Sequence, residues 1–344
     1  MNPAEFADFD NHEKVVFLSD EATGLAGIIA VHSTALGPAM GGCRMANYPD
    51  ADAALKDALR LSRGMSYKNA LAGLPAGGGK AVLYRVGAKA SRQAVFEAFA
   101  SAVDELGGTY VTAEDVGTSL ADMEFMARRT RFVSGLPVRA GTAGGDPSPW
   151  TALGVYLSIE AAAERPLKGA RVAVQGLGAV GFKVCEMLRR AGADLVVADV
   201  DRDRVGLALR DLDAEAVSVD RIHSVPADVF SPNALGGILN AETIPALGAP
   251  IVCGGANNQL ATSEDGHRLR ARGITYAPDY VVNAGGIINV VAEYLGEPAA
   301  SVEPRVRLIG DRVRRILESA KRDSLAPHEI ADQIGRNALG RSTT

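Results

Sequence analysis

The sequence predicts an α/β protein of two domains, and three features support this expectation. The chain has 344 residues, which is more than one domain usually contains. Between residues 171 and 253, short apolar runs alternate with helix-length stretches, a pattern typical of a parallel sheet covered by helices. Residues 134–149 are rich in Gly and Pro and predict a loop at a domain junction. We therefore expect one domain at 1–133 with the tail 325–344, a second at 134–324, and a cleft between them.

The first domain mixes helix and strand patterns. Leu55, Leu59 and Leu61 lie among polar residues, as in an amphipathic helix. Short runs of β-branched and apolar residues elsewhere indicate strands. These patterns predict strands at 14–17, 26–32, 81–84 and 110–112, and helices at 52–64 and 92–106.

The second domain repeats a strand-then-helix order. An apolar run at 171–175 precedes a helix pattern at 180–191, and a second apolar run follows at 194–199. Because parallel strands must be joined by long crossovers, this order predicts a parallel sheet. We expect further strands at 229–231 and 250–253, and a helical stretch near the C-terminus.

Composition and charge exclude several classes of function. The net charge is −5 and the pI is near 5.7, whereas nucleic acids and anionic membranes attract basic surfaces, so we expect neither as a partner. The sequence has no run of 18 apolar residues, and the acidic N-terminus is unlike a signal peptide. Three widely spaced cysteines without a CxxC pair predict a reducing, cytoplasmic setting and no metal site.

A glycine-rich segment with the sequence GLGAVG lies between a strand pattern and a helix pattern. Asp199 ends the next strand, 23 residues after Gly176. Glycines permit a tight turn and close approach to a pyrophosphate, and a helix N-terminus attracts phosphate. We therefore expect a Rossmann cofactor site formed by Gly176, Leu177, Gly178, Ala179, Val180, Gly181 and Asp199. The alternative is a glycine-rich turn that binds no ligand.

The acid also predicts which dinucleotide binds. Asp199 can accept hydrogen bonds from the adenosine ribose diol and would repel a 2′-phosphate, which favours NAD over NADP. Arg202 and Arg204 follow closely, so NADP stays open as an alternative.

Two lysines and an acid form a second group of interest. Lys68 and Lys80 lie 12 residues apart, and the segment fails the phosphate-loop pattern GxxxxGK followed by Ser or Thr. One lysine could hold a substrate carboxylate, and a buried lysine near another cation makes a good general base. Asp115 adds a carboxylate at a strand end. The spacing alone leaves open the alternative of two solvated surface lysines.

Seven motifs occur in order along the chain: LGPAMGGCRM (36–45), RGMSYKNALAGLPAGGGKAV (63–82), TAEDVGTSLADM (112–123), PSPWTALGVY (147–156), VQGLGAVG (174–181), GGANNQL (254–260) and YAPDYVVNAGGIINV (276–290). Together they resemble the leucine, phenylalanine and valine branch of the Glu/Leu/Phe/Val dehydrogenase family. The resemblance covers nearly the whole chain, and chance does not produce seven ordered motifs at family-like spacing.

The resemblance implies an NAD-dependent L-amino-acid dehydrogenase and a role for several residues. Lys68 matches the lysine that binds the substrate α-carboxylate, Lys80 the catalytic base, and Asp115 the acid that assists proton transfer. The implied reaction is reversible oxidative deamination, in which NAD takes the hydride, Lys80 activates a water, and a 2-oxo acid and ammonia are formed. Further matches are Asn258 beside the substrate and Thr151, Asn257 and Asn283 beside the cofactor.

The resemblance also assigns a task to each predicted domain. Residues 1–133 with 325–344 would bind the substrate and support oligomerisation, and residues 134–324 would bind NAD. Members of the family form oligomers, so we expect a homo-oligomer.

The pocket positions implied by the resemblance are apolar. Glutamate-specific relatives carry a lysine where this chain has Met40, and an unpaired glutamate carboxylate there would lose its hydration, so we predict that glutamate is rejected. We expect leucine, valine or isoleucine as the substrate. Phenylalanine or another aromatic amino acid is the alternative, because one methylene changes discrimination by only ~1–3 kcal/mol. The expected pocket residues are Met40, Gly41, Ala113, Ile287 and Val290.

A remote alternative is a catalytically silent NAD-binding regulator. The presence of Lys68, Lys80 and Asp115 argues against it. The five histidines lie outside the motifs, so we expect them at the surface or in packing.

Overall fold

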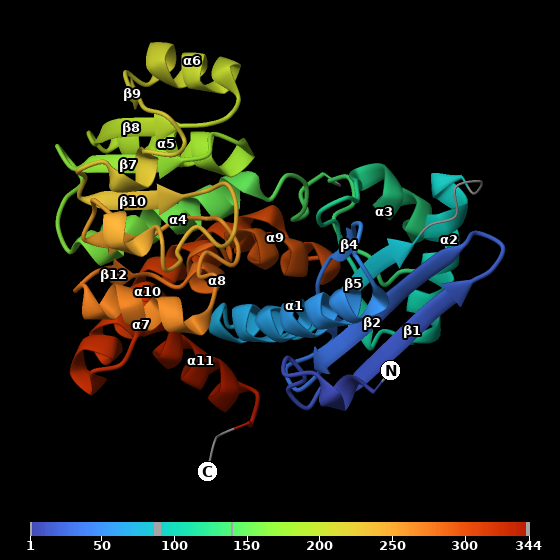
Figure 1. The fold of residues 1–344 in the computed structure, drawn as a ribbon. Helices are drawn as coiled ribbons and strands as arrows, with labels where there is room; N and C mark the ends of the chain where they lie inside the picture. The colour runs from blue at the N-terminus through green and yellow to red at the C-terminus, as the bar shows by residue number, and fades with distance from the viewer. Residues whose placement is uncertain (1, 86–90, 139, 342–344) are drawn as a thin grey trace. The chain divides into compact units, whose positions relative to one another are not determined.

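The computed structural model describes residues 2–85, 91–138 and 140–341 (Figure 1), and these residues form two compact units. Unit 1 contains the chain up to Gly145, Asn289–Ser301 and the chain from Gly335 onward. Unit 2 contains Asp146–Ile288 and Val302–Ile334. The α/β class predicted from the sequence is therefore confirmed.

The limits of the units differ from the expected boundaries at 133 and 325. The junction segment belongs to unit 1 because Glu293 accepts hydrogen bonds from the amides of Gly135 (3.0 Å) and Leu136 (2.9 Å). The last turns return to unit 1, where Arg336 donates to the Tyr67 hydroxyl at 3.1 Å. Both links join residues far apart in the sequence, which local patterns do not reveal.

Unit 1 is built on a mixed six-stranded sheet. Its order is β1-β2-β5-β3-β6, and β4 also pairs with β5. The pairs β1/β2 and β2/β5 are antiparallel, whereas β3, β4 and β6 run parallel to their partners. The strands are β1 (Lys14–Asp20), β2 (Leu25–Ser33), β3 (Ala39–Met40), β4 (Cys43–Met45), β5 (Gly77–Arg85) and β6 (Tyr110–Val111). The strands β3 and β4 were not predicted, because two or three residues show no periodicity.

Helix α1 (Ala51–Leu71) covers one face of this sheet. It begins where the sequence predicted, with the Asp50 side chain accepting from the amide of Ala53 at 2.8 Å, a typical N-cap. It does not end at Gly64 but continues for two more turns, so Lys68 lies on the helix. The other helices of this part of the chain are η1 (Pro3–Glu5), α2 (Arg92–Glu105) and α3 (Leu120–Ala127).

A buried apolar layer joins α1 to the sheet. Ile28, Ala30 and Val82 alternate on the face toward the helix and pack against Leu55 and Leu59. Residues on one face of a sheet recur with period two. Lys80 pairs with Ala30 across β2 and β5, so the sheet register turns Lys80 toward α1 as well.

Unit 2 is built on a parallel six-stranded sheet of order β12-β11-β10-β7-β8-β9. Every pair in it is parallel, as the strand-then-helix order predicted. The strands are β7 (Arg171–Gln175), β8 (Asp194–Ala198), β9 (Glu215–Ala216), β10 (Val229–Pro232), β11 (Ile251–Val252) and β12 (Thr275–Tyr276).

The helices of the second half of the chain connect and cover these strands. Helix α10 packs along α4, and α4 also contacts α5 (Figure 1). Helix α9 passes from unit 2 into unit 1 at residue 289, and α11 does so at residue 335. The helices are α4 (Ser148–Ala163), α5 (Ala179–Arg190), α6 (Arg202–Asp211), η2 (Ile222–Ser224), η3 (Ile244–Ala246), α7 (Ser263–Ala271), α8 (Asp279–Val282), α9 (Gly285–Tyr294), η4 (Ala299–Ser301), α10 (Val302–Asp323) and α11 (Pro327–Ala338).

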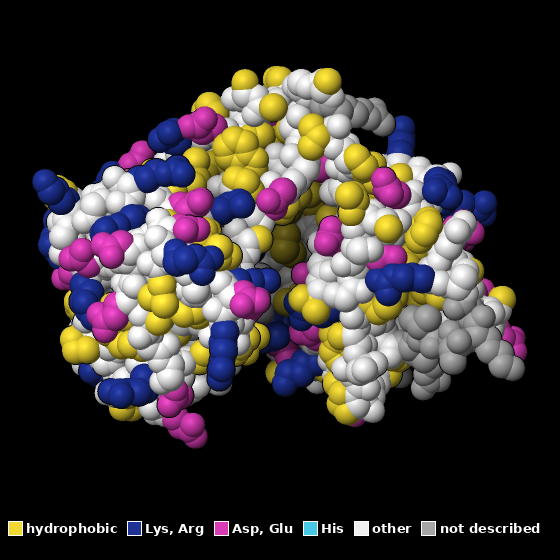
Figure 2. Space-filling model, turned by 90° about the horizontal axis from the view of Figure 1, so that it is seen from above, with side chains coloured by type: hydrophobic (Ala, Val, Ile, Leu, Met, Phe, Trp, Pro, Cys, Tyr) yellow, Lys and Arg dark blue, Asp and Glu magenta, His cyan; other side chains and the backbone are white. Residues whose placement is uncertain are grey.

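Charged side chains of both signs are interspersed on the surface viewed in Figure 2. On that face, within the part of the chain drawn in colour, neither sign forms a continuous field. None of the helices in the described segments is long and apolar enough to cross a bilayer.

Two histidines lie inside unit 1, in agreement with the packing role expected from the sequence. His12 bonds through Nε2 to the Leu59 carbonyl and the Ser62 hydroxyl, both at 3.0 Å. His32 is fully buried and receives a hydrogen bond from Arg341 at its Nε2 (2.7 Å). Burial, and after it the charge of the nearby His32, lowers the pKa of His12 to about 4. The neutral imidazole is therefore the form that fits the fold.

This burial predicts a specific acid sensitivity of the fold. Unfolded His12 binds a proton near pH 6.5 and folded His12 only near pH 4, so stability is present above pH 6.5 and is lost as the pH falls toward 4. His12 should contribute about 2–3 kcal/mol to that loss. The free energy of unfolding should be measured by chemical denaturation at pH 7, 5.5 and 4.5. His12→Gln should make this free energy depend less steeply on pH, whereas the control His223→Gln, a change on η2, should leave its pH dependence as in the wild type. An unchanged slope in His12→Gln would contradict the assignment.

Candidate active site

Lys80 and Asp115 form a close ion pair in unit 1. The Lys80 ammonium lies 2.7 Å from Oδ2 of Asp115, and Lys80 is only 5% exposed. Lys80 is part of β5, whereas Asp115 follows β6, so 35 residues of chain separate two groups that the sheet brings into contact. The alternative of two solvated surface lysines is therefore wrong for Lys80.

Glycines at the break between β3 and β4 permit this contact. A Cβ on Gly41 would lie 1.9 Å from the Gly79 carbonyl oxygen, so the two backbones can touch only without a side chain there. A Cβ on Gly42 would lie 2.8 Å from the Cβ of Asp115. The GG pair thus lets the segment of Asp115 pack directly over the sheet beside Lys80.

The segment that carries Asp115 is fixed to β4 by its backbone. The amide of Cys43 donates to the Ala113 carbonyl at 2.8 Å, and the amide of Asp115 donates to the Thr118 hydroxyl at 2.9 Å. Gly117 has φ +80°, a conformation that side chains disfavour, and closes the turn. These bonds hold the carboxylate in place before any substrate arrives.

Arg44 is a second cation on Asp115, which the sequence analysis missed. Its Nε lies 3.1 Å from Oδ2 of Asp115, and its Nη1 lies 3.0 Å from Oδ2 of Asp57 on α1. The Tyr48 hydroxyl donates to the same Asp57 oxygen at 2.6 Å. The sequence offered one signal for Arg44, which is a charged residue between two apolar residues in the GGCRM motif.

The electrostatic surroundings keep Asp115 ionised. Burial by itself raises the pKa of Asp115, but the charges and hydrogen bonds of Lys80, and then the charge of Arg44, outweigh burial and lower the pKa below its usual range. Asp115 is therefore a carboxylate near neutral pH and can accept a proton.

The remaining predicted residues of unit 1 lie on the elements around this pair. Lys68 is half-buried on the last turn of α1. A Cβ on Gly78 would lie 2.0 Å from the amide nitrogen of Ser66, so α1 touches β5 two residues before Lys68 and two before Lys80. Met40 is 2% exposed in β3, opposite Gly78. Ala113 is half-buried beside Asp115.

In unit 2, the glycine segment forms the turn from β7 into α5. Gly176 has φ +91°, and a Cβ on Gly181 would lie 1.9 Å from the Gly176 carbonyl oxygen, so helix and turn can meet only at glycine. Gly178 is the N-cap of α5, and no side chain caps that helix end. The segment Gly176, Leu177, Gly178, Ala179, Val180 and Gly181 is thus arranged as a phosphate-binding turn.

Asp199 follows β8 and connects the glycine turn to α6. Its Oδ2 accepts from the amide of Leu177 at 2.5 Å and its Oδ1 from the amide of Asp201 at 2.8 Å. Arg204 is paired with Asp201 at 3.2 Å. The carboxylate is therefore held at the position that the dinucleotide fingerprint requires.

The asparagines of the GGANN and NAGG motifs form one network in unit 2. Asn283 donates from Nδ2 to Oδ1 of Asn257 (2.8 Å) and to the Gly255 carbonyl (3.1 Å). The Asn258 amide donates to the buried Asp279 at 2.8 Å, which holds Asn258 at φ +53°. Within the described residues, no donor reaches the buried Oδ1 of Asn283. Asp279 was not predicted, although it lies within the YAPDY motif.

These observations fit a dinucleotide. No side chain caps the N-terminus of α5, so the amides of its first turn can face a pyrophosphate, and the Oδ1 of Asn283 is a buried acceptor that suits a donor such as an amide or a hydroxyl. Thr151 lies in the first turn of α4, where a Cβ on Gly286 would come within 2.8 Å of its hydroxyl oxygen. The predicted cofactor residues are thus assembled in unit 2.

The two remaining residues that the resemblance assigns to the substrate pocket lie on α9. Ile287 is half-buried and belongs to unit 2, and Val290, also half-buried, belongs to unit 1.

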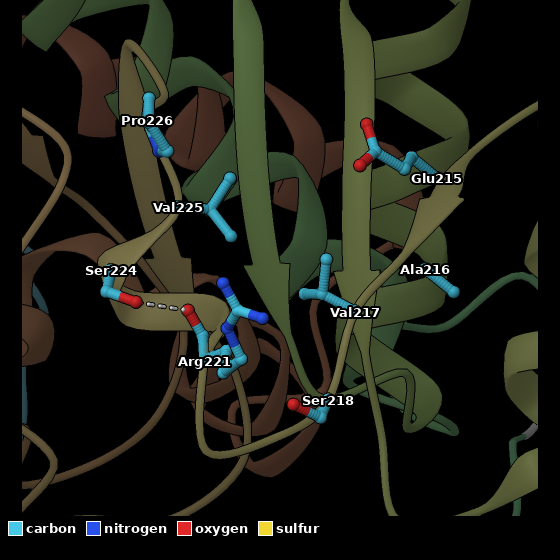
Figure 3. Close-up of a pocket in the computed structure, with 8 residues that line it drawn as sticks. All are labelled: Glu215, Ala216, Val217, Ser218, Arg221, Ser224, Val225 and Pro226. Carbon is cyan, nitrogen blue, oxygen red and sulfur yellow. Dashed lines mark hydrogen bonds between the residues drawn. The ribbon is translucent and has the colours of Figure 1, made fainter.

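A shallow hollow elsewhere in unit 2 is not part of these sites. Figure 3 shows it beside β9 and η2, where the Ser224 hydroxyl donates to the Arg221 carbonyl at 2.9 Å. Its lining residues are Glu215, Ala216, Val217, Ser218, Arg221, Ser224, Val225 and Pro226, none of which the sequence analysis selected.

A glycine turn that suits a dinucleotide on one unit, and a buried lysine beside an ionised acid on the other, are features expected of a dehydrogenase. Residues 12–132 match the family described as "Glu/Leu/Phe/Val dehydrogenase, dimerisation domain", and residues 202–303 match "Glutamate/Leucine/Phenylalanine/Valine dehydrogenase". The chain therefore belongs to the Glu/Leu/Phe/Val dehydrogenase family. It is an amino-acid dehydrogenase, and the family depends on NAD(P).

Known relatives cover almost the whole chain. A leucine dehydrogenase of Geobacillus stearothermophilus is 43% identical over 98% of this chain and 94% of its own length. A phenylalanine dehydrogenase of Caldalkalibacillus thermarum is 42% identical over 98% and 94%. The solved L-tryptophan dehydrogenase of Nostoc punctiforme is 40% identical, covers 96% of both chains and superposes with a TM-score of 0.85.

The contact of Gly42 with Asp115 predicts a strong effect of one methyl group. In Gly42→Ala the new Cβ meets the Asp115 Cβ at 2.8 Å and the Glu114 carbonyl at 2.6 Å, so Asp115 must move. We expect turnover to fall by about 100-fold, because small misplacements of reacting groups cost that much. Cofactor binding on unit 2, followed by NADH fluorescence, should change less than about twofold.

Gly64→Ala is the matched control, because a Cβ at Gly64 in α1 meets nothing within 4 Å. It should retain activity and raise stability by about 0.5–1 kcal/mol. Wild-type turnover in Gly42→Ala would show that the backbone adapts without displacing Asp115.

Proposed function

We propose that the protein catalyses the NAD-dependent, reversible oxidative deamination of an apolar L-amino acid, with leucine, valine and isoleucine favoured. The products are the 2-oxo acid and ammonia. The observation that carries this proposal is the buried Lys80–Asp115 pair, because it supplies a base and an acceptor carboxylate in one place. A silent NAD-binding regulator would have no use for a desolvated ion pair of this kind.

Lys68, Lys80 and Asp115 each have a defined task in this reaction. Lys68 binds the substrate α-carboxylate through a charge-assisted hydrogen bond. A bound nicotinamide cofactor would supply the acceptor for the hydride of the substrate Cα, and loss of that hydride converts the substrate to its iminium. Lys80, as its neutral amine, removes a proton from a water whose oxygen adds to the iminium carbon. Asp115, which took up a proton from the substrate ammonium before the hydride step, returns that proton to the nitrogen. The C–N bond then breaks, the hydroxyl proton passes to the Asp115 carboxylate, and the 2-oxo acid and ammonia leave.

NAD is the proposed cofactor, supported by the fixed position of Asp199. A carboxylate that already accepts two backbone amides, from Leu177 and Asp201, cannot turn away from a 2′-phosphate without losing those bonds. Arg204 forms an ion pair with Asp201, so the positive charge of Arg204 is partly compensated. Both observations disfavour NADP.

The substrate preference follows from the apolar pocket positions and from the relatives. Met40 has no charge to pair with a glutamate side chain, and Ala113, Ile287 and Val290 are equally apolar. A leucine dehydrogenase is 43% identical to this chain. An aromatic substrate is the second candidate, because a solved L-tryptophan dehydrogenase is 40% identical and covers 96% of the chain.

We further infer a homo-oligomer in the cytoplasm. The match to a dimerisation domain over residues 12–132 supports assembly. Cys43, Cys185 and Cys253 are free and buried, which suits a reducing compartment.

A substrate panel tests the proposed function directly. NADH formation should be measured at alkaline pH with L-leucine, L-valine, L-isoleucine, L-phenylalanine, L-tryptophan and L-glutamate. We expect branched-chain substrates to exceed glutamate by at least about 100-fold in kcat/KM, because glutamate would bury an unpaired charge. Lys80→Ala should abolish most turnover but retain NADH binding.

Other outcomes of the panel are equally informative. Aromatic preference would replace the branched-chain proposal but leave the deamination chemistry intact. Turnover in Lys80→Ala equal to that of the wild type would contradict the mechanism. No turnover with any of the six substrates would contradict the proposed substrate class.

The cofactor proposal predicts a switch at Asp199. Asp199→Asn removes the charge and keeps one side-chain acceptor for the amide of Leu177 or Asp201. The ratio of kcat/KM with NADP to that with NAD should rise by about tenfold or more, because the repulsion of a 2′-phosphate is lost. An unchanged ratio would mean that other residues select the cofactor.

A further inference from the structure

Arg44 occupies an unusual position, because one guanidinium bridges two carboxylates of unit 1. Its Nε lies 3.1 Å from Oδ2 of Asp115, and its Nη1 lies 3.0 Å from Oδ2 of Asp57. Arg44 pairs with Val82 across β4 and β5, and Val82 faces α1. The sheet register thus turns the arginine toward the same face as Lys80.

The far end of Arg44 is anchored on α1. Asp57 accepts from Arg44, from the Tyr48 hydroxyl at 2.6 Å and, at its other oxygen, from Arg60 at 3.1 Å. The side chains of Arg44 and Asp57 are only 21% and 14% exposed. A poorly hydrated charge is costly to separate from its partners, so this anchor fixes the guanidinium.

Two cations share one oxygen of Asp115. Lys80 approaches Oδ2 at 2.7 Å and Arg44 approaches the same atom at 3.1 Å. The two cations differ in chemistry. A lysine can gain and lose a proton during a reaction, whereas an arginine stays charged at any pH that the protein tolerates.

We propose that Arg44 is a positioning residue for the deamination reaction, which holds Oδ2 of Asp115 so that Oδ1 exchanges the proton with the substrate nitrogen. This inference rests on the proposed function and deepens it. When Lys80 is neutral, Arg44 remains the permanent cation that keeps Asp115 oriented and ionised. The role of Arg44 therefore belongs to the proton-transfer steps and not to substrate binding.

The groups that face Asp115 support this assignment. The charged ones are Lys80 from β5 and Arg44 from β4, and both lower the pKa of Asp115 against the effect of burial. Cys43 and Tyr110 also interact electrostatically with Asp115, but burial raises the pKa of both side chains, so both are neutral. On the far side of Arg44, Asp57 is ionised and Tyr48 is neutral.

The test compares Arg44→Gln with Arg44→Lys and with the control Arg60→Gln. Arg60 shares Asp57 with Arg44, but its side chain is 43% exposed and makes its contact with Asp57, away from Asp115. We expect Arg44→Gln to lower kcat by about 10- to 100-fold with KM changed less than about threefold. The acidic limb of the kcat profile should move to higher pH, because losing a cation raises the pKa of Asp115. Arg44→Lys should restore part of kcat, and Arg60→Gln should behave as the wild type.

A second measurement does not depend on turnover. In protein labelled with carboxyl-¹³C aspartate, the Asp115 resonance, assigned with Asp115→Asn, should titrate at higher pH in Arg44→Gln than in the wild type or in Arg60→Gln. If Arg44→Gln does not fold, Arg44→Met removes the charge while keeping an unbranched side chain of similar length, and should shift the same resonance in the same direction. The NMR result tests the contact even if no amino acid in the panel is oxidised, so failure of the proposed function is distinguished from failure of this inference.

A double-mutant comparison separates positioning from general stability. In an Asp115→Asn background, Arg44→Gln should lower kcat by less than about threefold, because its effect passes through Asp115. A full 10- to 100-fold loss in that background, or an Asp115 titration unchanged by Arg44→Gln, would overturn the inference.

Discussion

Two cations, Lys80 and Arg44, meet one oxygen of Asp115 in a site that is largely removed from water. Charges cost much free energy to bury unless they are paired closely, so the backbone must bring their parent strands into contact. The glycines of the first two motifs meet that requirement, because a Cβ on Gly41 would collide with the backbone of β5. Unit 1 is thus organised around an electrostatic contact that only a bare backbone allows.

In unit 2, hydrogen bonds within the protein hold side-chain acceptors and backbone amides in fixed positions for a ligand. The Asn283 side chain ties the GGANN segment together, and Asp279 holds the amide of Asn258. The glycine turn is held by Asp199, whose carboxylate accepts a hydrogen bond from the amide of Leu177. These contacts are made in the protein alone, so little ordering entropy remains to be lost on binding.

Prediction from sequence was most successful where the pattern is local. The strand at 171–175 and its glycine turn were located closely, because apolar runs and glycines have strong conformational preferences. Helix α1 was shortened at Gly64, since a glycine usually weakens a helix, but packing on the sheet carries the helix on to Leu71. The compact units divide the chain at other residues than the expected boundaries, because Glu293 accepts hydrogen bonds from the amides of residues 135 and 136, which lie 157 or more positions away.

The sequence by itself determined the α/β class and located the glycine turn, and its resemblance to the family pointed to Lys68, Lys80 and Asp115 as candidates, because each lies in a motif of adjacent residues. Only the tertiary structure decided that Lys80 is buried against Asp115, and that Arg44 and Asp57 complete the charge cluster. Strand register and helix packing set which side chains share a face, and both arise from contacts between distant segments. The ion-pair partner of a charged residue in a motif is therefore known only from the folded structure.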